Sequence, residues 1–348
     1  MGYYDEVEKE NVLRLREKMA NLPSFCKDFF RSIEPRTTSK TRLAYAYDLS
    51  VFFNYLKENN PYFKDRNIEL SDLDSINFQD IEEYIEYLKF YHDNNNVEVS
   101  NSVSGIKRKI ATLRSFYKYF YNNELIKTNP AAKVSLPRLR DKEITRLDVN
   151  EVVELLNSVE SGENLTVNEK RFHEKTKTRD IALLSLLLGT GMRVSECIGI
   201  NLSDIDLKNT AIKIKRKGGK VAIIYFSDEV LKPLNEYIEE RKKIVDVDSK
   251  NEDALFLSLQ NKRITARAVE NLVKKYATKI TPLKHITPHK LRSTFGTTLY
   301  QETDDIYLVA SVLGHNDVNT TKKHYAAIEE NKKRLSRNIV KLRDNENK

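Results

Sequence analysis

A short segment that follows a buried apolar run has residue types suited to phosphate binding. It reads Gly189-Thr190-Gly191-Met192-Arg193, so an arginine stands at the expected start of a helix. Helix N-termini attract phosphate, and an arginine there adds a planar, permanently charged group. Glu196 lies three residues later on the same helix face and can orient the guanidinium. A helical corner with a surface ion pair would have the same pattern.

A second segment, Thr287-Pro288-His289-Lys290-Leu291-Arg292, begins another expected helix. Threonine suits the capping position, and proline suits the first helical position. His289 and Arg292 then share one helix face. A histidine there can transfer a proton near neutral pH while the arginine holds an anionic oxygen. A surface helix also explains such a pair, so the pair alone is weak evidence.

Two further elements could complete a site for attack on a phosphodiester. Gly314 is expected to end a helix and to leave His315 at a turn, and Tyr325 follows ten residues later. Nearby cations would have to ease ionisation of the phenol, whose ordinary pKa is about 10. Lys217 precedes Gly218-Gly219 at the expected tip of a hairpin, from which an ammonium could reach DNA. In isolation, Tyr325 would be a core tyrosine and Lys217 a solvated turn residue.

The elements that must position these residues fall into two halves. The first half shows apolar residues at helical spacing. The second half mixes helices with two β-branched runs joined by a tight turn. The expected helices are 43–58, 77–91, 103–121, 151–158, 179–188, 228–244, 265–279, 288–301, 304–313 and a tail from about 329. The expected strands are 210–216 and 220–226, and 160–178 is expected to be a polar loop.

Charge is segregated in the first half. Acidic residues dominate 65–98, whereas 101–140 holds nine basic residues and the single acid Glu124. The basic stretch is interleaved with aromatic residues, which can pack inward while the basic groups face phosphates. A solvated helix face is the plainer alternative. Asn129-Pro130 and Pro137 then interrupt the helical pattern, so we expect an interdomain linker within 129–141.

The composition bounds the class of protein. The net charge of +8 suits a phosphate-bearing partner, although a basic protein need not bind nucleic acid. The two cysteines, Cys26 and Cys197, belong to no CxxC or Cys/His cluster, so we expect no zinc site. The N-terminus is too polar for a secretory signal, and no apolar run is long enough to span a membrane. The small number of cysteines fits a reducing cytoplasm.

Taken together and in order, the motifs resemble the tyrosine recombinase (phage-integrase-like) family. The segments RKGGK, ITPHKLRSTFGTTLY and LGH carry the resemblance, which is strongest to the single-protein Xer-type recombinases of Gram-positive bacteria. It implies a mostly α fold with a small antiparallel sheet in the C-terminal domain, arranged as a two-domain C-shaped clamp. The implied domains are an N-terminal extension (1–35), a helical core-binding, SAM-like domain (36–135), a linker (136–142) and a catalytic domain (143–348).

The resemblance also implies a mechanism that needs neither metal nor ATP. Tyr325 would attack the scissile phosphate to give a 3′-phosphotyrosine and, later, a Holliday junction. Arg193 and Arg292 would hold the phosphate oxygens, and His315 would add a hydrogen bond. Lys217 would protonate the leaving 5′-oxygen, His289 would act as acid or base, and Glu196 would hold Arg193. The expected DNA contacts are Lys107, Arg108, Lys109, Arg114, Lys118 and Lys290. The family often has histidine where this chain has Ser293.

The implied partner is a double-stranded DNA site with inverted half-sites, bound by a homotetramer, with an accessory DNA-binding or translocase protein as a further partner. Residues 329–344, with Leu335, Ile339 and Leu342 at helical spacing, could dock on a neighbouring protomer or on their own domain. The expected location is the bacterial cytoplasm, at the nucleoid. A non-catalytic architectural protein and a type IB topoisomerase are the alternatives. The sequence does not separate chromosome dimer resolution from integration and excision of a mobile element, or from inversion.

Overall fold

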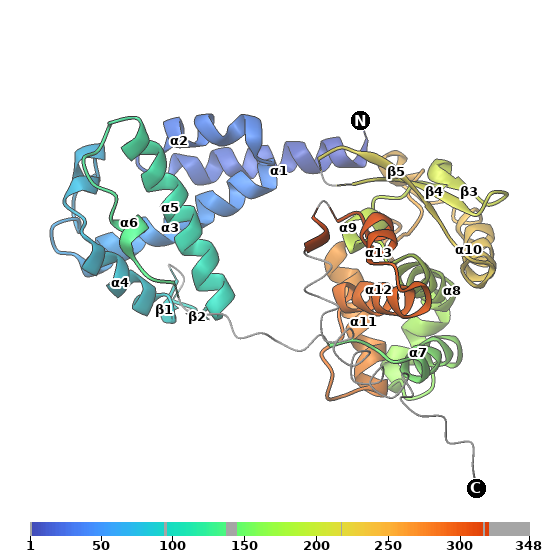
Figure 1. Cartoon of the computed structure of the whole chain (residues 1–348). Coiled ribbons are helices and arrows are strands. Elements are labelled where there is room, and N and C mark those ends of the chain that lie inside the picture. Colours follow the sequence, from blue (N-terminus) through green and yellow to red (C-terminus); the bar gives the residue numbers. More distant parts are fainter. Residues whose placement is uncertain (1, 94–95, 137–144, 217, 316, 320–348) are drawn as a thin grey trace, which may run out of the picture. The chain divides into compact units, whose positions relative to one another are not determined.

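The structure is a computed structural model of the chain that describes residues 2–93, 96–136, 145–216, 218–315 and 317–319 (Figure 1). Lys217, Tyr325 and the tail from 329 lie outside these residues. The chain divides into two compact units, Met1–Lys142 and Glu143–Lys348. Both units are built mainly of helices with small antiparallel sheets, which confirms the predicted fold class.

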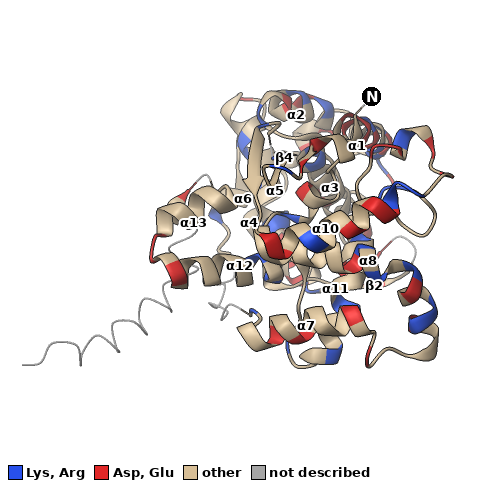
Figure 2. Ribbon diagram, turned by 90° about the vertical axis from the view of Figure 1, so that its right-hand side faces the viewer, with Lys and Arg blue, Asp and Glu red and all other residues tan. Residues whose placement is uncertain are grey.

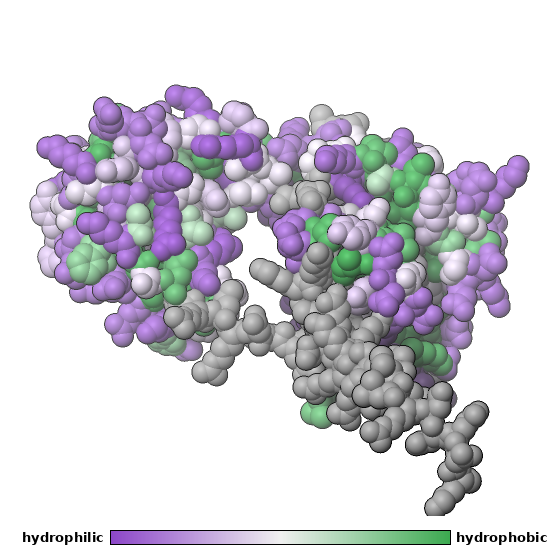
Figure 3. Space-filling view, viewed as in Figure 1, coloured by the Kyte–Doolittle hydropathy of each residue, from purple (hydrophilic) through white to green (hydrophobic). Residues whose placement is uncertain are grey.

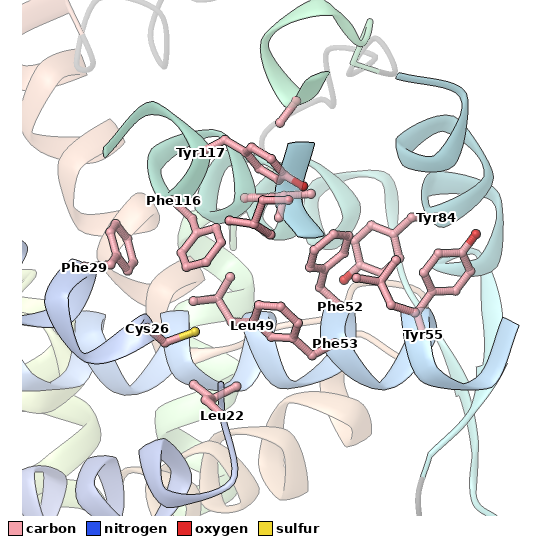
Figure 4. Packing of buried hydrophobic residues seen from close by; sticks show 14 of the residues in the cluster. Leu22, Cys26, Phe29, Leu49, Phe52, Phe53, Tyr55, Tyr84, Phe116 and Tyr117 are labelled. Carbon is pink, nitrogen blue, oxygen red and sulfur yellow. The ribbon is translucent and has the colours of Figure 1, made fainter. Parts of the chain in front are cut away.

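The first unit packs its helices around an aromatic core. Its elements are α1 (Tyr3–Ala20), α2 (Cys26–Ile33), α3 (Ser39–Asn59), α4 (Phe78–Tyr87), β1 (Phe90–His92), β2 (Glu98–Ser100), α5 (Val103–Asn122) and α6 (Pro130–Lys133). Phe29, Phe52 and Phe116 are at most 1% exposed, and side chains from α2, α3, α4 and α5 point toward one another there (Figure 4). Rings of this size bury much apolar surface each, so the core rests on them.

Two segments of the first unit differ from the sequence prediction. The helix expected over 77–91 ends at Tyr87, and Phe90–His92 instead forms β1, which pairs antiparallel with β2. Only the middle residue of β1, Tyr91, is buried, and this alternation suits a strand. Residues 130–133 form α6, and Ala131 and Val134 belong to the core. The predicted linker therefore does not begin before Val134. Residues 3–33 form α1 and α2, which contribute Leu15 and Phe29 to the same core.

Among its described residues, the second unit has helices and one three-stranded sheet. Its helices are α7 (Val149–Ser161), α8 (Val167–Thr190), α9 (Val194–Cys197), α10 (Asp228–Arg241), α11 (Ala266–Ile280), α12 (Pro288–Thr303) and α13 (Ile306–Leu313), and its strands are β3 (Ile205–Asp206), β4 (Ala211–Lys215) and β5 (Val221–Tyr225). The central helix α8 packs against α7, α10 and α12 (Figure 1). The second half of α8 is apolar and buried, and the neighbouring helices pack around it.

The prediction of a polar loop over 160–178 is wrong. Residues 167–190 form one continuous helix, which begins with a capping box between Thr166 and Glu169. That motif satisfies free backbone N–H groups at a helix start and favours helix over loop. The first half of α8 lacks an apolar stripe because its buried face carries His173 and Thr176. The buried polar face hid the helix from a search for apolar periodicity.

The predicted hairpin is confirmed, and its second strand, β5, forms one edge of the sheet. β4 and β5 pair antiparallel up to Lys215 and Val221, and Gly218 and Gly219 both have positive φ in the turn. The sheet order is β3-β4-β5, so β3 adds a strand that the sequence did not predict. Val221 and Ile223 on β5 are 60% exposed, and hydrophobic surface gathers there (Figure 3).

The helix α10 mixes both signs of charge. α10 carries acidic and basic residues along its length (Figure 2), so it does not form a single-sign basic face. Within the described residues, no helix is long and apolar enough to cross a membrane.

Candidate active site

The C-terminal end of α8 positions the first candidate arginine. Gly191 caps the helix in the left-handed conformation, with φ of 61°. A Cβ there would also lie 2.9 Å from Cγ of Phe295, so glycine suits the position for two reasons. Met192 is buried and anchors the turn, and Arg193 follows as the N-cap of α9.

Arg193 is held by Glu196. The guanidinium Nη1 donates to Oε1 at 2.9 Å, and the backbone N–H of Arg193 donates to Oε2 at 2.8 Å. The Glu196 side chain is only 4% exposed, whereas that of Arg193 is 37% exposed. The carboxylate is thus fixed inside the fold, while the arginine keeps a solvent-facing edge that could meet a ligand.

Arg292 lies on α12 and is only 4% exposed. Its Nη1 donates to the backbone oxygen of Gly191 at 2.7 Å, and its Nη2 donates to that of Leu313. Arg193 donates through Nη2 to the next oxygen along the chain, that of Gly314, at 3.3 Å. The two predicted arginines, far apart in sequence, are therefore brought together at the C-terminal end of α13.

A third arginine meets the same helix end. Arg216, the residue after β4, donates through Nη2 to the backbone oxygen of Val312 at 2.9 Å. Three successive carbonyl groups at this helix end thus each accept from a different arginine. A helix C-terminus carries partial negative charge, so guanidinium groups are favourable there. Arg216 was not among the predicted site residues, although it belongs to the RKGGK segment that carries part of the family resemblance.

The histidines lie at the ends of the two helices. His289 is exposed in the first turn of α12, where Arg292 follows three residues later. His315 is half-buried directly after α13, and its backbone N–H donates to the oxygen of Ala310 at 2.9 Å. Ser293 donates through Oγ to the oxygen of His289 at 3.1 Å, a bond within one helix. Lys217 and Tyr325 lie outside the described residues, so their roles stay predictions.

The candidate DNA contacts on α5 have different surroundings. Lys118 is exposed, and Lys107 is half-buried, as Lys290 is on α12. Lys109 donates to Oδ1 of Asn101 at 3.0 Å, and burial lowers the pKa of its ammonium. Arg108 is about half exposed and pairs at 2.5 Å with Asp48, whose side chain is only 2% exposed.

Arg114 is partly buried and donates to main-chain oxygens of its own unit. Its Nε donates to the backbone oxygen of Ala131 at 3.0 Å, and its Nη2 donates to that of Val134 at 2.5 Å. These bonds tie α5 to α6 within the first unit. The sequence suggested a phosphate contact, but a basic residue on an amphipathic helix can equally hold main-chain carbonyls at the edge of the core.

The described residues hold no group of three or more histidine, cysteine, aspartate or glutamate side chains arranged to bind a metal ion. Cys197 is buried beside the site, and burial raises the pKa of its thiol. A thiol held in its neutral form is a poor nucleophile, so Cys197 acts as packing next to Glu196.

Comparison with known proteins decides the family. Residues 145–332 match the phage integrase family, and residues 27–124 match the phage integrase N-terminal SAM-like domain. The chain belongs to the phage integrase family. It is a tyrosine site-specific recombinase, and the predicted recognition is confirmed.

This recombinase is similar to Xer proteins over most of its length. It is 34% identical over 310 residues to the tyrosine recombinase XerC of Caldanaerobacter subterraneus, covering 85% of this chain and 80% of that protein. It is 28% identical over 293 residues to XerD of Staphylococcus epidermidis, covering 84% of this chain and 90% of that protein.

The fold of the recombinase is also found in solved structures. A XerH recombinase in a post-cleavage complex with a palindromic difH substrate gives a TM-score of 0.63 at 22% identity, covering 86% of this chain and 79% of that one. The integrase of transposon Tn1549 in complex with circular intermediate DNA gives 0.61 at 20% identity, covering 86% and 94%. At these identities the likeness concerns the fold.

Proposed function

We propose that this recombinase cuts one DNA strand with Tyr325 and rejoins it to a different partner, with Arg193 and Arg292 holding the scissile phosphate. The observation that carries the proposal is the meeting of these two arginines at the end of α13, next to His315. Glu196 fixes Arg193 from behind. Preorganised guanidinium groups stabilise the charge that develops on phosphate oxygens in the transition state.

The proposed chemical step requires neither a metal nor a nucleotide. The Tyr325 hydroxyl oxygen forms a bond to phosphorus and gives up its proton, which His289 accepts. The bond from phosphorus to the 5′-oxygen breaks, and Lys217 gives that oxygen a proton. His315 donates a hydrogen bond to a phosphate oxygen. The energy of the phosphodiester stays in the 3′-phosphotyrosine, so the reverse attack by a 5′-hydroxyl of a partner strand reseals the DNA.

The proposed substrate is a double-stranded site with inverted half-sites, by analogy with the palindromic difH site in the XerH complex. We assign 36–135 to DNA binding and 143–348 to catalysis, with the two domains closing around DNA as a clamp and four copies assembling on paired sites. The exposed Lys118 and half-buried Lys107 on α5 would contact phosphates, as would Arg108, Lys109 and Lys290. The enzyme would act in the bacterial cytoplasm at the nucleoid, in chromosome dimer resolution or in movement of a mobile element.

The proposal is tested by covalent trapping on fragmented host DNA. Wild-type protein should leave DNA attached after denaturation in SDS, whereas Tyr325→Phe should bind DNA without forming an adduct. Sequencing of the trapped DNA would give the target site and separate the biological roles. An adduct with Tyr325→Phe would assign the nucleophile to another residue.

The same assay separates the alternative functions. No adduct from the wild type despite specific binding would favour an architectural protein. Relaxed circles without exchanged strands would favour a topoisomerase. Arg193→Ala should remove cleavage from a folded protein, and normal cleavage by that variant would refute its assigned contact with phosphate.

A further inference from the structure

We propose that Arg216 is a positioning residue for the recombination reaction, fixing the hairpin end next to Lys217 against the helix end next to His315. The proposal rests on the proposed function, because it concerns the delivery of the proton from Lys217. Arg216 directly follows β4, and its side chain reaches α13, so one residue connects two elements that lie next to predicted catalytic groups.

The guanidinium of Arg216 is partly buried and is bonded to the main chain at the end of α13. Its Nη2 donates to the oxygen of Val312 at 2.9 Å, and its Nε is buried without a hydrogen-bond partner among the described residues. The group packs against Gly314, where an added Cβ would lie 3.0 Å from Nε and closer still to Cζ. The unpaired Nε is a cost of this packed arrangement, because that N–H would be hydrated in a solvated side chain. The bond to Val312 and the partial negative charge at the C-terminal end of α13 act in the opposite direction and hold the side chain there.

The backbone of Arg216 is fixed as firmly as its side chain. Its N–H donates to the oxygen of Lys220 at 2.7 Å, and its own oxygen accepts from Gly219 at 3.1 Å. These bonds close the turn that Gly218 and Gly219 make with positive φ. Both main-chain groups of Arg216 are therefore hydrogen-bonded across the hairpin. Lys217 is the next residue in the sequence.

Through its contact with α13, the hairpin is attached to the same helix end as the two arginines that are proposed to bind phosphate. Arg193, Arg216 and Arg292 each donate to the end of α13, at Gly314, Val312 and Leu313 respectively. Without Arg216, the hairpin would keep its turn but lose its side-chain connection to that helix end. A displacement of about 1 Å in a reacting group can cost about a hundredfold in rate, so this connection is expected to be felt in catalysis.

The test compares two DNA substrates that differ in one atom. In one, the leaving group is the ordinary 5′-oxygen, which needs a proton. In the other, it is a bridging 5′-sulfur, which leaves readily as a thiolate because thiol pKa values are about 8.5. Arg216→Ala should cleave the oxygen substrate about 10- to 100-fold more slowly than wild type and the sulfur substrate within about threefold. Arg216→Lys should recover part of the rate, since an ammonium can still donate to Val312.

Two reference variants make the outcomes distinct. Lys217→Ala should show the same selective rescue by sulfur, and Lys220→Ala, which removes an exposed charge from the same hairpin, should cleave both substrates like wild type. If Lys217→Ala is rescued but Arg216→Ala is slow on both substrates, or normal on both, the positioning role is overturned. If Lys217→Ala is not rescued, the proposed acid itself fails, and with it the role given to Arg216. DNA binding by Arg216→Ala checks that the variant is folded. If that variant does not bind DNA, Arg216→Lys takes its place, and it must cleave the oxygen substrate more slowly than wild type but the sulfur substrate at a similar rate.

Discussion

The Arg193 guanidinium donates to a Glu196 carboxylate that is itself almost completely buried, across one turn of α9. A second bond, from the Arg193 backbone to the same carboxylate, closes that turn. Glu196 therefore fixes both the backbone and the side chain of the arginine. A buried carboxylate is stabilised only when its partners are present, so the pair behaves as one unit.

We predict that Glu196→Gln cleaves DNA about tenfold or more slowly than wild type while binding it with similar affinity, because a neutral amide holds the guanidinium less firmly. Single-turnover cleavage of a nicked substrate, beside a binding titration, measures both quantities. Glu154→Gln, an exposed residue on α7, is the control and should be unchanged. Unchanged cleavage by Glu196→Gln would show that Arg193 does not depend on this partner.

A glycine at the end of α8 gives a second prediction. Gly191→Ala should lower the free energy of unfolding by about 1–3 kcal/mol, because the left-handed backbone strains any other residue. The added Cβ would also press on Phe295 and shift the oxygen that Arg292 uses. Gly218→Ala is a matched control, since it too has positive φ but has no neighbour within 4 Å of the added atom. If both variants lose the same stability, the contact with Phe295 has no effect on folding.

Substitution of two basic residues on α5 should affect different properties, stability in one case and DNA binding in the other. Arg114→Ala should lower the free energy of unfolding by about 1–3 kcal/mol, since it leaves the oxygens of Ala131 and Val134 without their charged donor. Lys118→Ala should leave stability unchanged, weaken DNA binding and reduce its salt dependence by about one counterion. Denaturant unfolding and binding at several salt concentrations separate the two effects. A change in salt dependence for Arg114→Ala alone would restore that residue as a phosphate contact.

The buried His173 predicts a dependence of stability on pH. Its pKa lies below 6.5, chiefly because burial disfavours the imidazolium and secondarily because Lys275 repels it, against smaller opposing contributions from Glu174 and Asp180. As the pH falls through 6.5, the unfolded chain takes up a proton that the folded chain resists. The free energy of unfolding should therefore decrease on the acid side of 6.5 and be retained above it.

The His173→Asn variant tests this prediction, because asparagine keeps a hydrogen-bonding atom for the Tyr276 hydroxyl, which lies 3.0 Å from Nδ1. Its free energy of unfolding, measured by denaturant between pH 7.5 and 5, should fall less steeply than that of wild type. Equal slopes for the two proteins would mean that other groups cause the acid dependence.

The sequence predicted features that depend on short-range chemistry. The hairpin followed from Gly218-Gly219 between β-branched runs, and the pairing of Arg193 with Glu196 followed from their spacing on one helix. The first half of α8 was missed because its buried face is polar, with His173 in place of an aliphatic residue. β1 was missed because the apolar residues before it have helical spacing that runs on past Tyr87.

The joining of distant segments could not be predicted from spacing. Arg292 donates to Gly191, which lies about a hundred residues earlier, and only the packing of α12 on α8 brings them together. Arg216 was overlooked for a related reason. Beside a turn it has the pattern of a solvated basic residue, and its partner is a main-chain oxygen on another helix, which leaves no mark in the sequence.

That main-chain attachment bears on how the end of α13 can evolve. The oxygens of Val312 and Leu313 are present whatever side chains those positions carry, so mutation there cannot delete the acceptors. Divergent relatives could change position 312 widely and still retain the arrangement, provided that the helix ends at the same residue. A library randomised at 312, with Gly314 fixed, should thus yield many active clones, whereas a one-residue insertion in α13 should yield almost none.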